Sequence, residues 1–402
     1  MTTATVSTLV DEAAELLPSL VRLRREIHSD PELGMELPRT QARVVDALAP
    51  LGLEITLGAS LGSVAAVLRG GAPGPTVLLR GDMDALPMRE RTGLDYAADA
   101  DVMHACGHDL HVAGLVGAAR LLHAHREELA GDVLFMFQPG EEVGDGAATM
   151  IEEGLLRLSG SAPVAAYGIH VVPGEYGIFS TRPGPIMAGS LELAVTIVGS
   201  GGHASAPHLT VDPVPVVAEL VTAMQTFVTR RFDVFDPVVL TVTQLRAGGA
   251  ARNIIADTAT LGASIRVLSP AAQQLVQTEL PRLITAIAAA HGCTAEIELS
   301  LLCPATVNDE AATADVFDVL RATFGDERVW LTPNPVMGSE DFSYVLERVP
   351  GTYLFLRASP PGANLDEIAP NHSPDVIFDD AVLADQAAAL AQLALARLRP
   401  AD

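Results

Sequence analysis

The sequence predicts a mixed α/β protein into which a smaller α+β domain is inserted. The chain has 402 residues, more than one ordinary hydrophobic core accommodates, which favours two domains. Strand-like apolar runs alternate with helical segments in the first part of the chain and again after Cys303-Pro304, as in an α/β sheet with parallel portions. Residues 187–302 instead have the order strand, helix, strand, strand, helix, strand, which is the ferredoxin-like arrangement. We therefore expect a large domain made of residues 1–186 and 303–402, and an inserted domain made of residues 187–302.

The elements of the large domain follow from the spacing of its apolar residues. Helices are expected where apolar residues recur every three or four positions, as at Val112, Leu115 and Val116. Strands are expected where short apolar runs are bounded by turn residues. The predicted helices cover residues 8–27, 37–51 and 108–129, and the predicted strands cover residues 64–68, 76–79, 133–137 and 164–171.

The inserted domain begins after a glycine- and proline-rich turn at residues 182–185. Residues 191–197 alternate between apolar and polar types, which is typical of a sheet with one exposed face. Asp212-Pro213 and Ser269-Pro270 each place a capping side chain before a first-turn proline, so each pair predicts the start of a helix. Three further strands are predicted over residues 238–245, 258–267 and 294–301.

The chain is strongly acidic and poor in cysteine. Its 50 acidic and 25 basic residues give a net charge of -25, which repels nucleic acid and anionic membranes. The three cysteines Cys106, Cys293 and Cys303 make no disulfide framework and fit a reducing compartment. The N-terminal segment lacks the basic start and apolar run of a signal peptide, and no segment reaches the roughly 18 apolar residues of a spanning helix. We expect a soluble cytoplasmic protein.

Residue types that bind metals are concentrated in the stretch Met103-His104-Ala105-Cys106-Gly107-His108-Asp109-Leu110-His111. Further acidic and imidazole side chains follow the predicted strands or lie in a late loop: Asp82, Asp84, Glu141, Glu142, His170 and His372. In open α/β sheets, ligands bind beyond the carboxyl ends of the strands. We therefore expect these side chains to converge on one place.

Five of these residues have the chemistry of metal ligands: Cys106, His108, Glu142, His170 and His372. Two divalent ions held by this set would share one ligand, and the Cys106 thiolate could be that bridge. Glu141 then remains as a carboxylate that takes a proton from water, and Asp84 could orient a ligand imidazole. The pattern indicates metal-assisted hydrolysis, in which the ions polarise a carbonyl and lower the pKa of water. A thiolate favours zinc, whereas oxygen ligands and water also admit manganese, cobalt or nickel.

Each residue taken alone also has a structural interpretation. Paired glutamates and Asp-x-Asp sequences are usually turns or caps, and a single buried histidine or thiol is usually part of the core. These interpretations weaken when all the clusters fall at strand ends of one sheet. Cys293 and Cys303 have no such neighbours, so we assign them as core or surface thiols. His104 and His111 are either additional ligands or residues that cap the helix or contact a substrate.

A series of short motifs extends along nearly the whole chain. They are Arg24-Arg25-Glu26-Ile27-His28, Pro31-Glu32-Leu33-Gly34, Arg80-Gly81-Asp82-Met83-Asp84-Ala85-Leu86-Pro87, His104-Ala105-Cys106-Gly107-His108-Asp109, Phe137-Gln138-Pro139-Gly140-Glu141-Glu142, Gly201-Gly202-His203-Ala204, Asn253-Ile254-Ile255, Gly338-Ser339-Glu340-Asp341-Phe342 and Asn371-His372-Ser373-Pro374. In this order they resemble the M20 family of metallopeptidases, and in particular its amidohydrolase branch, which includes hippurate hydrolases and N-acyl-L-amino acid amidohydrolases.

The resemblance implies a mixed-sheet, zinc-peptidase-like catalytic domain with an inserted dimerisation domain. It implies the same five metal ligands, with Glu141 as the general base and Asp84 as a second catalytic carboxylate. Other branches of the family place a histidine where this chain has Asp82. That departure matches the amidohydrolase branch, in which the cysteine joins the metal ligands.

The resemblance also implies substrate-binding residues in the inserted domain. His203 matches a residue that reaches the substrate, in the partner subunit's site; its other interpretation is a loop histidine near glycines. Asn253 and Arg266 are similar to substrate-binding positions of the family. A guanidinium binds a carboxylate through two parallel hydrogen bonds, so Arg266 would hold the amino-acid half of an amide substrate. A structural ion pair is the competing role for Arg266.

The expected protein is a dinuclear metal-dependent amidohydrolase that cleaves N-acyl-L-amino acids of the hippurate or N-acetyl type. It is expected to act as a homodimer or a higher homo-oligomer. One alternative is a dipeptidase or carboxypeptidase of the same family. Another is a non-catalytic binding protein on the same scaffold, because a fold alone does not establish an activity. Loss of a ligand or of the base would mark such a protein, and here every expected position is filled.

Overall fold

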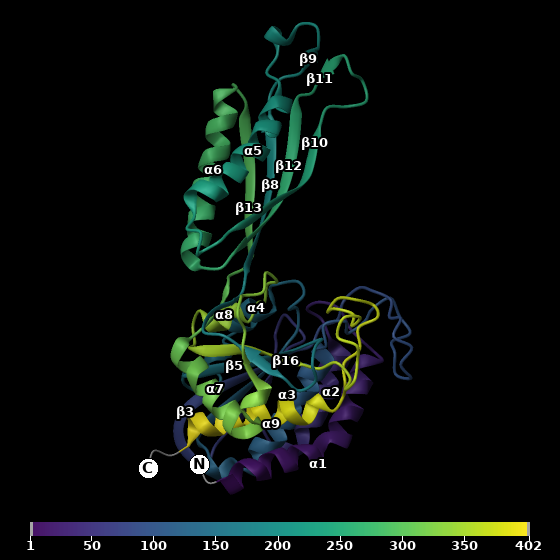
Figure 1. Cartoon of the computed structure of the whole chain (residues 1–402), viewed down its shortest axis with the longest axis vertical. Helices are drawn as coiled ribbons and strands as arrows, with labels where there is room; N and C mark the ends of the chain where they lie inside the picture. The colour runs from purple at the N-terminus through teal and green to yellow at the C-terminus, as the bar shows by residue number, and fades with distance from the viewer. Residues whose placement is uncertain (1–2, 400–402) are drawn as a thin grey trace. The chain divides into compact units, whose positions relative to one another are not determined.

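The computed structural model describes residues 3–399, and the side chains of residues 8–399. These residues form two compact units (Figure 1). Among these residues, the large unit comprises 3–186, 307–334 and 341–399, and the small unit comprises Met187–Thr306 and Pro335–Glu340. The chain passes between the units along β7 (Gly184–Met187) and β14 (Thr306–Asn308).

The small unit extends beyond the predicted residue 302 because the following backbone packs against its first strand. A Cβ added at Gly189 would lie 2.7 Å from the backbone nitrogen of Ala305, so only a glycine permits this approach. Residues 335–340 join the same unit through a parallel bridge between Met187 and Val336.

The large unit contains an eight-stranded mixed sheet with the order β1-β2-β4-β3-β5-β16-β6-β15. The central strands β4, β3, β5 and β16 are parallel to one another. The strand β2 pairs with β4 in the antiparallel direction, and β1 pairs with β2 in the antiparallel direction. The strands are β1 (Glu54–Leu57), β2 (Val64–Leu68), β3 (Ala72–Asp82), β4 (Ala130–Gln138), β5 (Ala165–Val172), β6 (Phe179–Thr181), β15 (Val329–Leu331) and β16 (Gly351–Arg357). The mixed α/β fold class predicted from the sequence is confirmed.

Helices cover the sheet of the large unit. They are α1 (Thr3–His28), α2 (Pro38–Leu48), α3 (His108–Ala124), α4 (Gly146–Glu152), α7 (Glu310–Phe324), α8 (Ser343–Leu346) and α9 (Val382–Leu398). The helices α3 and α9 are buried along almost their whole lengths, and they pack against each other and against α1. Two predicted helices end earlier than expected, because α2 and α3 each give way to a short 3-10 turn, at Ala49–Leu51 and Arg126–Glu128.

The small unit contains a four-stranded antiparallel sheet with the order β10-β12-β8-β13. Its elements are β8 (Gly189–Val198), α5 (Pro213–Arg231), β10 (Val239–Ala247), β12 (Thr258–Val267), α6 (Pro270–Ala290) and β13 (Thr294–Cys303). Both predicted helix starts carry side-chain caps, since Asp212 accepts a hydrogen bond from the Val214 nitrogen and Ser269 accepts one from the Ala272 nitrogen. The ferredoxin-like arrangement is confirmed. A two-stranded ribbon of β9 (Gly202–His203) and β11 (Ile254–Ile255) extends this unit.

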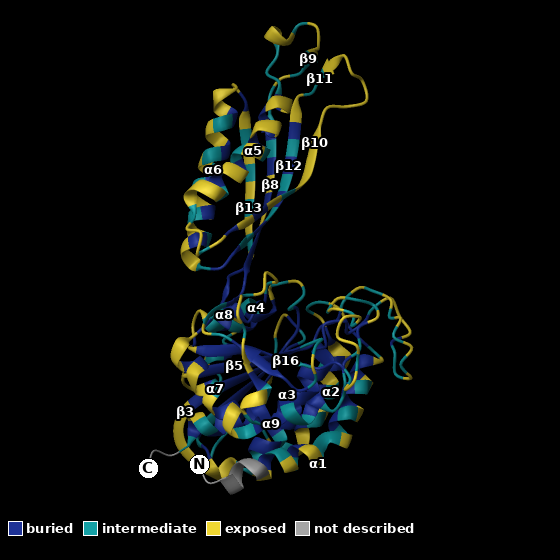
Figure 2. Cartoon of the chain, viewed as in Figure 1, coloured by how far each residue is buried: buried dark blue, intermediate teal, exposed yellow. Residues whose placement is uncertain are grey.

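Burial differs between the two sheets (Figure 2). All residues of β2 and nearly all of β5 are buried, as expected for strands covered on both faces. The strands β12 and β13 of the small unit alternate between buried or half-buried and more exposed positions, and most of β10 is exposed. Each unit has its own hydrophobic core. Among the described residues, no helix is long and apolar enough to cross a membrane.

Candidate metal centre and active site

The predicted ligands gather at the carboxyl edge of the central parallel strands. The strands β3, β4 and β5 are neighbours in the sheet and end near Asp82, Gln138 and His170 respectively. The Cys106 sulfur lies 3.3 Å from Nε2 of His170 and 3.2 Å from Nε2 of His372. Side chains that are widely separated in the sequence therefore meet at one edge of the sheet, as parallel strands allow.

The turn before α3 brings Cys106 and His108 to this edge. Gly107 caps α3 with a left-handed backbone, at a φ of 84°. A Cβ at this position would lie 2.4 Å from the Cγ2 atom of Val171, so the turn packs closely on β5 only because residue 107 is glycine. This contact places Cys106 beside His170.

Backbone carbonyl groups orient two of the predicted imidazole ligands. The Nδ1 atom of His108 donates to the Asp84 carbonyl oxygen at 2.8 Å, and Nδ1 of His170 donates to the Val171 carbonyl oxygen at 2.7 Å. With the proton on Nδ1, each ring presents the lone pair of Nε2 to the centre. Hydrogen bonds of this kind fix the tautomer of metal-binding histidines.

Asp84 fixes the position of the predicted base. Its Oδ1 atom accepts from the Glu141 backbone nitrogen and its Oδ2 atom from the Glu142 backbone nitrogen, each at 3.0 Å. The chain turns towards Asp84 at Gly140, where φ is 72°. The imidazole of His108 donates a hydrogen bond to the carbonyl group of Asp84, and its Nδ1 atom also lies 3.6 Å from the Asp84 carboxylate that holds the two glutamates.

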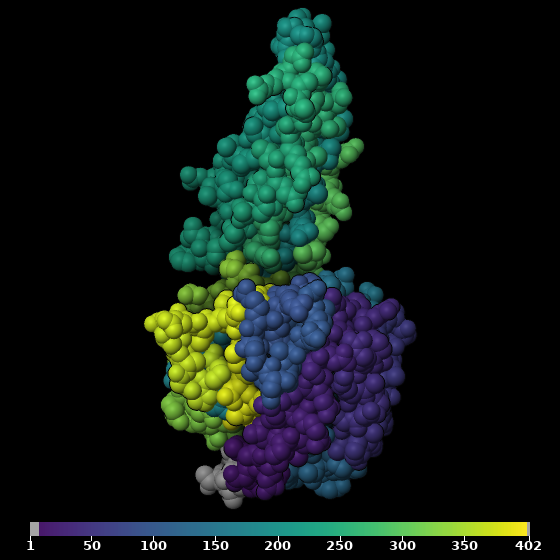
Figure 3. Space-filling view, turned by 90° about the vertical axis from the view of Figure 1, so that its right-hand side faces the viewer, coloured from purple at the N-terminus to yellow at the C-terminus, as the bar shows by residue number. Residues whose placement is uncertain are grey.

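His372 reaches the centre from the loop between β16 and α9. It is the one non-glycine residue with a positive φ among those described, at 64°, and its backbone nitrogen donates to the Ala105 carbonyl oxygen at 3.0 Å. The loop lies beside the segment that follows β3 (Figure 3), where the Arg91 nitrogen donates to the Pro374 carbonyl oxygen at 2.8 Å. Left-handed backbone in a residue with a Cβ is strained, and such strain is common at functional sites.

The donor atoms form overlapping groups of metal-binding size. Cys106, His108 and His170 offer donors within 4.8 Å of one another, and so do Cys106, Glu142 and His372. The two groups share Cys106. The buried Nε2 atom of His108 makes no hydrogen bond among the described residues, and the buried Oε1 atom of Glu142 has only ion-pair contacts there, with Nε2 of His372 at 3.4 Å and Nε2 of His108 at 4.0 Å. Buried polar atoms without partners are costly, so their chemistry and burial fit a pair of divalent ions.

The electrostatics of the cluster favour a thiolate. Burial by itself would raise the pKa of Cys106, but the imidazoles of His170 and His108 hold it well below its ordinary value. Hydrogen bonds to Cys106 and Glu142 raise the pKa of His372 to about 10. Burial raises the pKa of Glu142. The thiolate is the form of cysteine that binds a metal, and a cation would take the place of the protons now shared among these groups.

His111 lies close to the cluster, but both of its ring nitrogens already make hydrogen bonds. Its Nε2 atom accepts from the Val171 backbone nitrogen at 2.8 Å, so its Nδ1 atom carries the proton and donates to Asp82. Asp82 also accepts from Arg80 at 2.6 Å. Both His111 and Asp82 therefore act as supports behind the donor groups that contain Cys106.

His104 belongs to none of the candidate donor groups. It is buried, and neither of its ring nitrogens has a hydrogen-bond partner among the described residues. Burial lowers its pKa to about 3, so the ring is neutral. Of the two histidines left open by the sequence, His104 thus belongs to no candidate donor group, whereas His111 belongs to one with Asp82 and His108 that does not contain Cys106.

The three predicted substrate-binding residues lie in the small unit. His203 and Asn253 are exposed on the β9–β11 ribbon, where Ala204 donates its backbone N–H to the Asn253 carbonyl oxygen at 3.0 Å. Nδ1 of His203 accepts from the backbone nitrogen of Ser205 at 3.1 Å, and from its hydroxyl at 2.8 Å. Arg266, on β12, donates to the Ser339 hydroxyl at 3.1 Å.

Several supporting residues near the site act through hydrogen bonds and were not predicted from the sequence. Asp341 accepts from Gln138 at 2.6 Å, from the Ala147 nitrogen at 2.9 Å and from Arg80 at 3.2 Å, which ties the ends of β3 and β4 together. Asn371 and Ser205 are further examples. The signal was their position: Asn371 precedes His372 in one motif, Asp341 belongs to another motif, and Ser205 directly follows the motif that contains His203.

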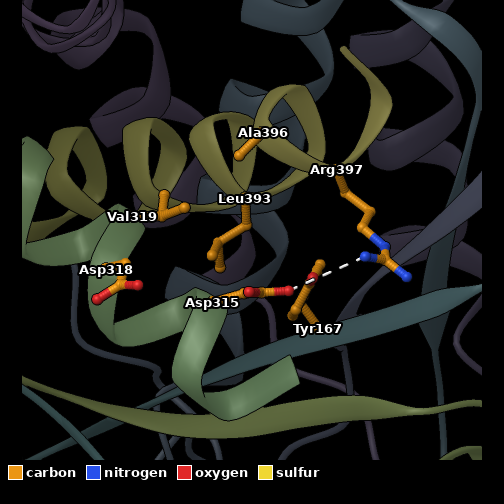
Figure 4. A pocket seen from close by; sticks show the side chains of 7 residues that line it. All are labelled: Tyr167, Asp315, Asp318, Val319, Leu393, Ala396 and Arg397. Carbon is orange, nitrogen blue, oxygen red and sulfur yellow. Dashed lines mark ion pairs between the residues drawn. The ribbon is translucent and has the colours of Figure 1, made fainter. Parts of the chain in front are cut away.

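A separate cavity of about 230 Å³ lies between α7, α9 and the first residues of β5 (Figure 4). It is lined by Tyr167, Asp315, Asp318, Val319, Leu393, Ala396 and Arg397. Asp315 and Arg397 lie 3.9 Å apart across it. Because Tyr167 is near the start of β5 and His170 near its end, the cavity is not part of the candidate metal centre.

Comparisons with known proteins agree with this geometry. The model of peptidase family M20/M25/M40 matches residues 78–396. Thermostable carboxypeptidase 1 of Saccharolobus solfataricus is 36% identical over 97% of this chain and 98% of its own length. Hippurate hydrolase of Campylobacter jejuni is 33% identical over 97% of this chain and 100% of its own length.

A solved structure extends the similarity to three dimensions. The crystal structure of a dinuclear metal-binding peptidase of the M20 family from Bacillus subtilis is 28% identical, with a TM-score of 0.81. The comparison covers 96% of this chain and 99% of that one. The chain belongs to peptidase family M20, as its motifs predicted. It is a metal-dependent hydrolase of amide bonds. The alternative of a non-catalytic binding protein on the same scaffold is therefore excluded.

Proposed function

We propose that the protein hydrolyses the amide bond of N-acyl-L-amino acids of the hippurate or N-acetyl type. Two divalent ions would be held by the five predicted ligands, Cys106, His108, Glu142, His170 and His372. The observation that carries this proposal is the meeting of donor groups at Cys106, next to a pair of glutamates whose backbone is fixed by Asp84. The similarity to the hippurate hydrolase supports the substrate class.

The residues of the chain divide the work of hydrolysis. When bound, the ions would supply Lewis-acid polarisation of the amide carbonyl and would lower the pKa of water. Glu141 takes a proton from the attacking water and passes it to the leaving amine. His203 donates a hydrogen bond to the developing oxyanion. Arg266 binds the carboxylate of the amino-acid half, and Asn253 contacts the substrate beside it.

A hydrolysis screen with each metal restored to stripped protein tests the proposal. Zinc, manganese, cobalt and nickel would each be added in turn, with hippurate and N-acetyl amino acids as substrates. We expect hydrolysis of at least one of these amides that depends on added metal. No hydrolysis of any N-acyl amino acid with any of the four metals would contradict it.

The second candidate function is that of a carboxypeptidase or dipeptidase. The similarity to a thermostable carboxypeptidase favours it. Both activities use the same centre, so the discriminating measurement is kcat/KM for free dipeptides and for N-blocked peptides, compared with N-acetyl amino acids. Higher values for the peptides would establish this second function.

We propose that the protein is a cytoplasmic homodimer formed through the small unit. Most of the edge strand β10 is exposed, and it includes the exposed apolar residues Val239 and Leu245. An exposed apolar edge strand is prone to pair with another chain. The three free cysteines are all buried, which fits a reducing compartment.

Subunit mixing tests whether His203 acts in the partner subunit's site. His203→Ala and Glu141→Gln proteins should each have kcat lowered by roughly 100-fold or more when assayed alone. If His203 acts across the dimer, mixed dimers regain one complete site, and activity should return to roughly a quarter of that of the natural protein. No recovery after verified subunit exchange would contradict action in the partner subunit's site. Sedimentation of the natural protein would separate a dimer from a higher assembly.

A further inference from the structure

We propose that Asn371 is a positioning residue of the metal centre, whose side-chain amide donates hydrogen bonds to the Cys106 sulfur and to the backbone beside two ligands. The proposal rests on the proposed ligand set. It goes beyond that set because Asn371 is neither a ligand nor the base. Asn371 acts through the residues that it holds.

The surroundings of the Asn371 amide define its orientation. Its Nδ2 atom lies 3.6 Å from the Cys106 sulfur, 3.4 Å from the Cys106 carbonyl oxygen and 3.4 Å from the Val171 carbonyl oxygen. A thiolate and two carbonyl oxygens can only accept hydrogen bonds from an amide. The side chain must therefore present its NH₂ group to them and not its oxygen.

These contacts join three segments that each carry a proposed ligand. The Val171 carbonyl oxygen that faces Asn371 also accepts from Nδ1 of His170, at 2.7 Å. The next residue, His372, donates its backbone N–H to the Ala105 carbonyl oxygen at 3.0 Å. The Asn371-His372 pair is thus anchored on both Ala105 and Cys106, which offsets the strained backbone of His372 at a φ of 64°.

The contact with sulfur has a chemical consequence. A hydrogen bond to a ligand sulfur withdraws electron density from it, and hydrogen bonds of this kind tune metal–thiolate centres. Removing the amide N–H should make the Cys106 thiolate a stronger electron donor. It should also loosen the placement of Cys106, His170 and His372 relative to one another.

Two substitutions separate these effects from simple loss of volume. Asn371→Asp keeps the shape of the side chain but turns an oxygen towards three acceptors. Asn371→Ala removes the donor without adding a charge. Asn364→Asp is the matched control, because Asn364 is exposed in the same loop and its Oδ1 atom only accepts a hydrogen bond, from the Asp366 nitrogen at 3.3 Å.

The test is a Co²⁺ titration of metal-stripped protein, monitored by the thiolate-to-cobalt charge-transfer band in the near ultraviolet. We expect the band of both Asn371 variants to move to lower energy than that of the natural protein. We also expect their Co²⁺ affinity to fall by roughly 10–100-fold, as for other residues that support metal ligands. The Asn364→Asp variant should match the natural protein in both measurements.

The outcomes separate this inference from the ligand assignment. If the natural protein shows no thiolate band, Cys106 is not a ligand and both proposals fall. If the natural protein shows the band but a folded Asn371→Ala variant leaves both its energy and the affinity unchanged, only the role of Asn371 is overturned. A loss of Co²⁺ affinity without any shift of the charge-transfer band would show that Asn371 does not donate a hydrogen bond to the Cys106 sulfur. Circular dichroism verifies the fold of each variant.

Discussion

In the large unit the proposed ligands are held by partners on several segments, whereas in the small unit His203 and Asn253 are exposed and Arg266 is half-buried, each with few partners. His108 and His170 are each oriented by a backbone carbonyl group, and Asp84 holds both glutamates. His203 is exposed and is held by Ser205, two residues away. Four of the five proposed ligands are buried or half-buried and His372 is exposed, and this mostly buried region is organised before any substrate binds. The exposed region can act only when a substrate or another chain reaches it.

This comparison predicts that changes in the two regions have different signatures. Variants of the buried region should alter metal content or the chemical step. Variants of the exposed region should alter kinetics while leaving metal content and thermal unfolding as they are. The predictions below run from the largest expected effect to the smallest.

Replacing a proposed ligand should have the largest effect. His170→Ala removes one donor from the group that contains Cys106 and His108. We expect metal content per chain to fall, activity to drop to background and the thermal unfolding midpoint to decrease, because bound metal stabilises the folded state. Elemental analysis and thermal unfolding check this. A His170→Ala protein with full metal content and activity would remove His170 from the ligand set.

Glu141→Gln should leave the metal in place and stop the chemical step. The amide cannot accept a proton from water, so we expect kcat to fall by roughly 10²–10⁴-fold with little change in metal content. Asp84 should still hold the backbone of residue 141, because its contact is with the main-chain nitrogen. Full activity in a metal-loaded Glu141→Gln enzyme would exclude Glu141 as the base.

His203→Ala tests the exposed region. Since the Ser205 nitrogen donates to Nδ1 of His203, the neutral ring carries its proton on Nε2 and can donate it to an oxyanion. Loss of one such donor costs roughly 10²–10³-fold in kcat. We expect this loss with unchanged metal content and unfolding midpoint. Reduced metal binding in this variant would contradict the prediction that changes in the exposed region leave metal content unchanged.

Arg266→Lys should mainly weaken substrate binding. A lysine keeps the positive charge but loses the two parallel hydrogen bonds of a guanidinium, so we expect KM to rise by about 10-fold with a smaller change in kcat. The matched measurement uses an N-acyl amino acid amide, which lacks the free carboxylate. An equal rise in KM for both substrates would assign Arg266 the structural role suggested by its hydrogen bond to Ser339.

Ser205→Ala should have the smallest effect. It removes one of the two donors to Nδ1 of His203 and leaves the backbone N–H in place. The loss of one neutral hydrogen bond, about 1 kcal/mol, corresponds to roughly a five-fold decrease in kcat. The decrease should disappear in a His203→Ala background. An additive decrease in the double variant would show that Ser205 does not act through His203.

The sequence was sufficient to predict where the proposed ligands gather, because the topology of a parallel sheet determines the edge at which its strands end. Asp82, Glu142 and His170 all follow or end such strands, so their convergence needs no knowledge of side-chain contacts. The ferredoxin-like insertion could also be predicted from the sequence, because Asp212 and Ser269 cap the starts of its two helices.

The remaining details depend on contacts between distant segments. His108 and His111 lie on one helix and look alike in the sequence, but both ring nitrogens of His111 make hydrogen bonds, to the Val171 nitrogen and to Asp82, whereas Nε2 of His108 makes none among the described residues. The left-handed backbone of His372 is not encoded by a glycine, so local sequence gives no sign of it. The hydrogen bonds from the Glu141 and Glu142 backbone to Asp84 follow a turn of the chain at Gly140. The spacing of apolar residues does not predict these hydrogen bonds.

The central claim is that Cys106 and His372 share a pair of metal ions with His108, Glu142 and His170. The most direct measurement is a crystal structure of the metal-loaded protein, with diffraction recorded on both sides of the absorption edge of the metal. The account predicts two anomalous peaks per chain, with the Cys106 sulfur as a ligand to both. A single peak, or two peaks without contact to Cys106 and His372, would contradict it.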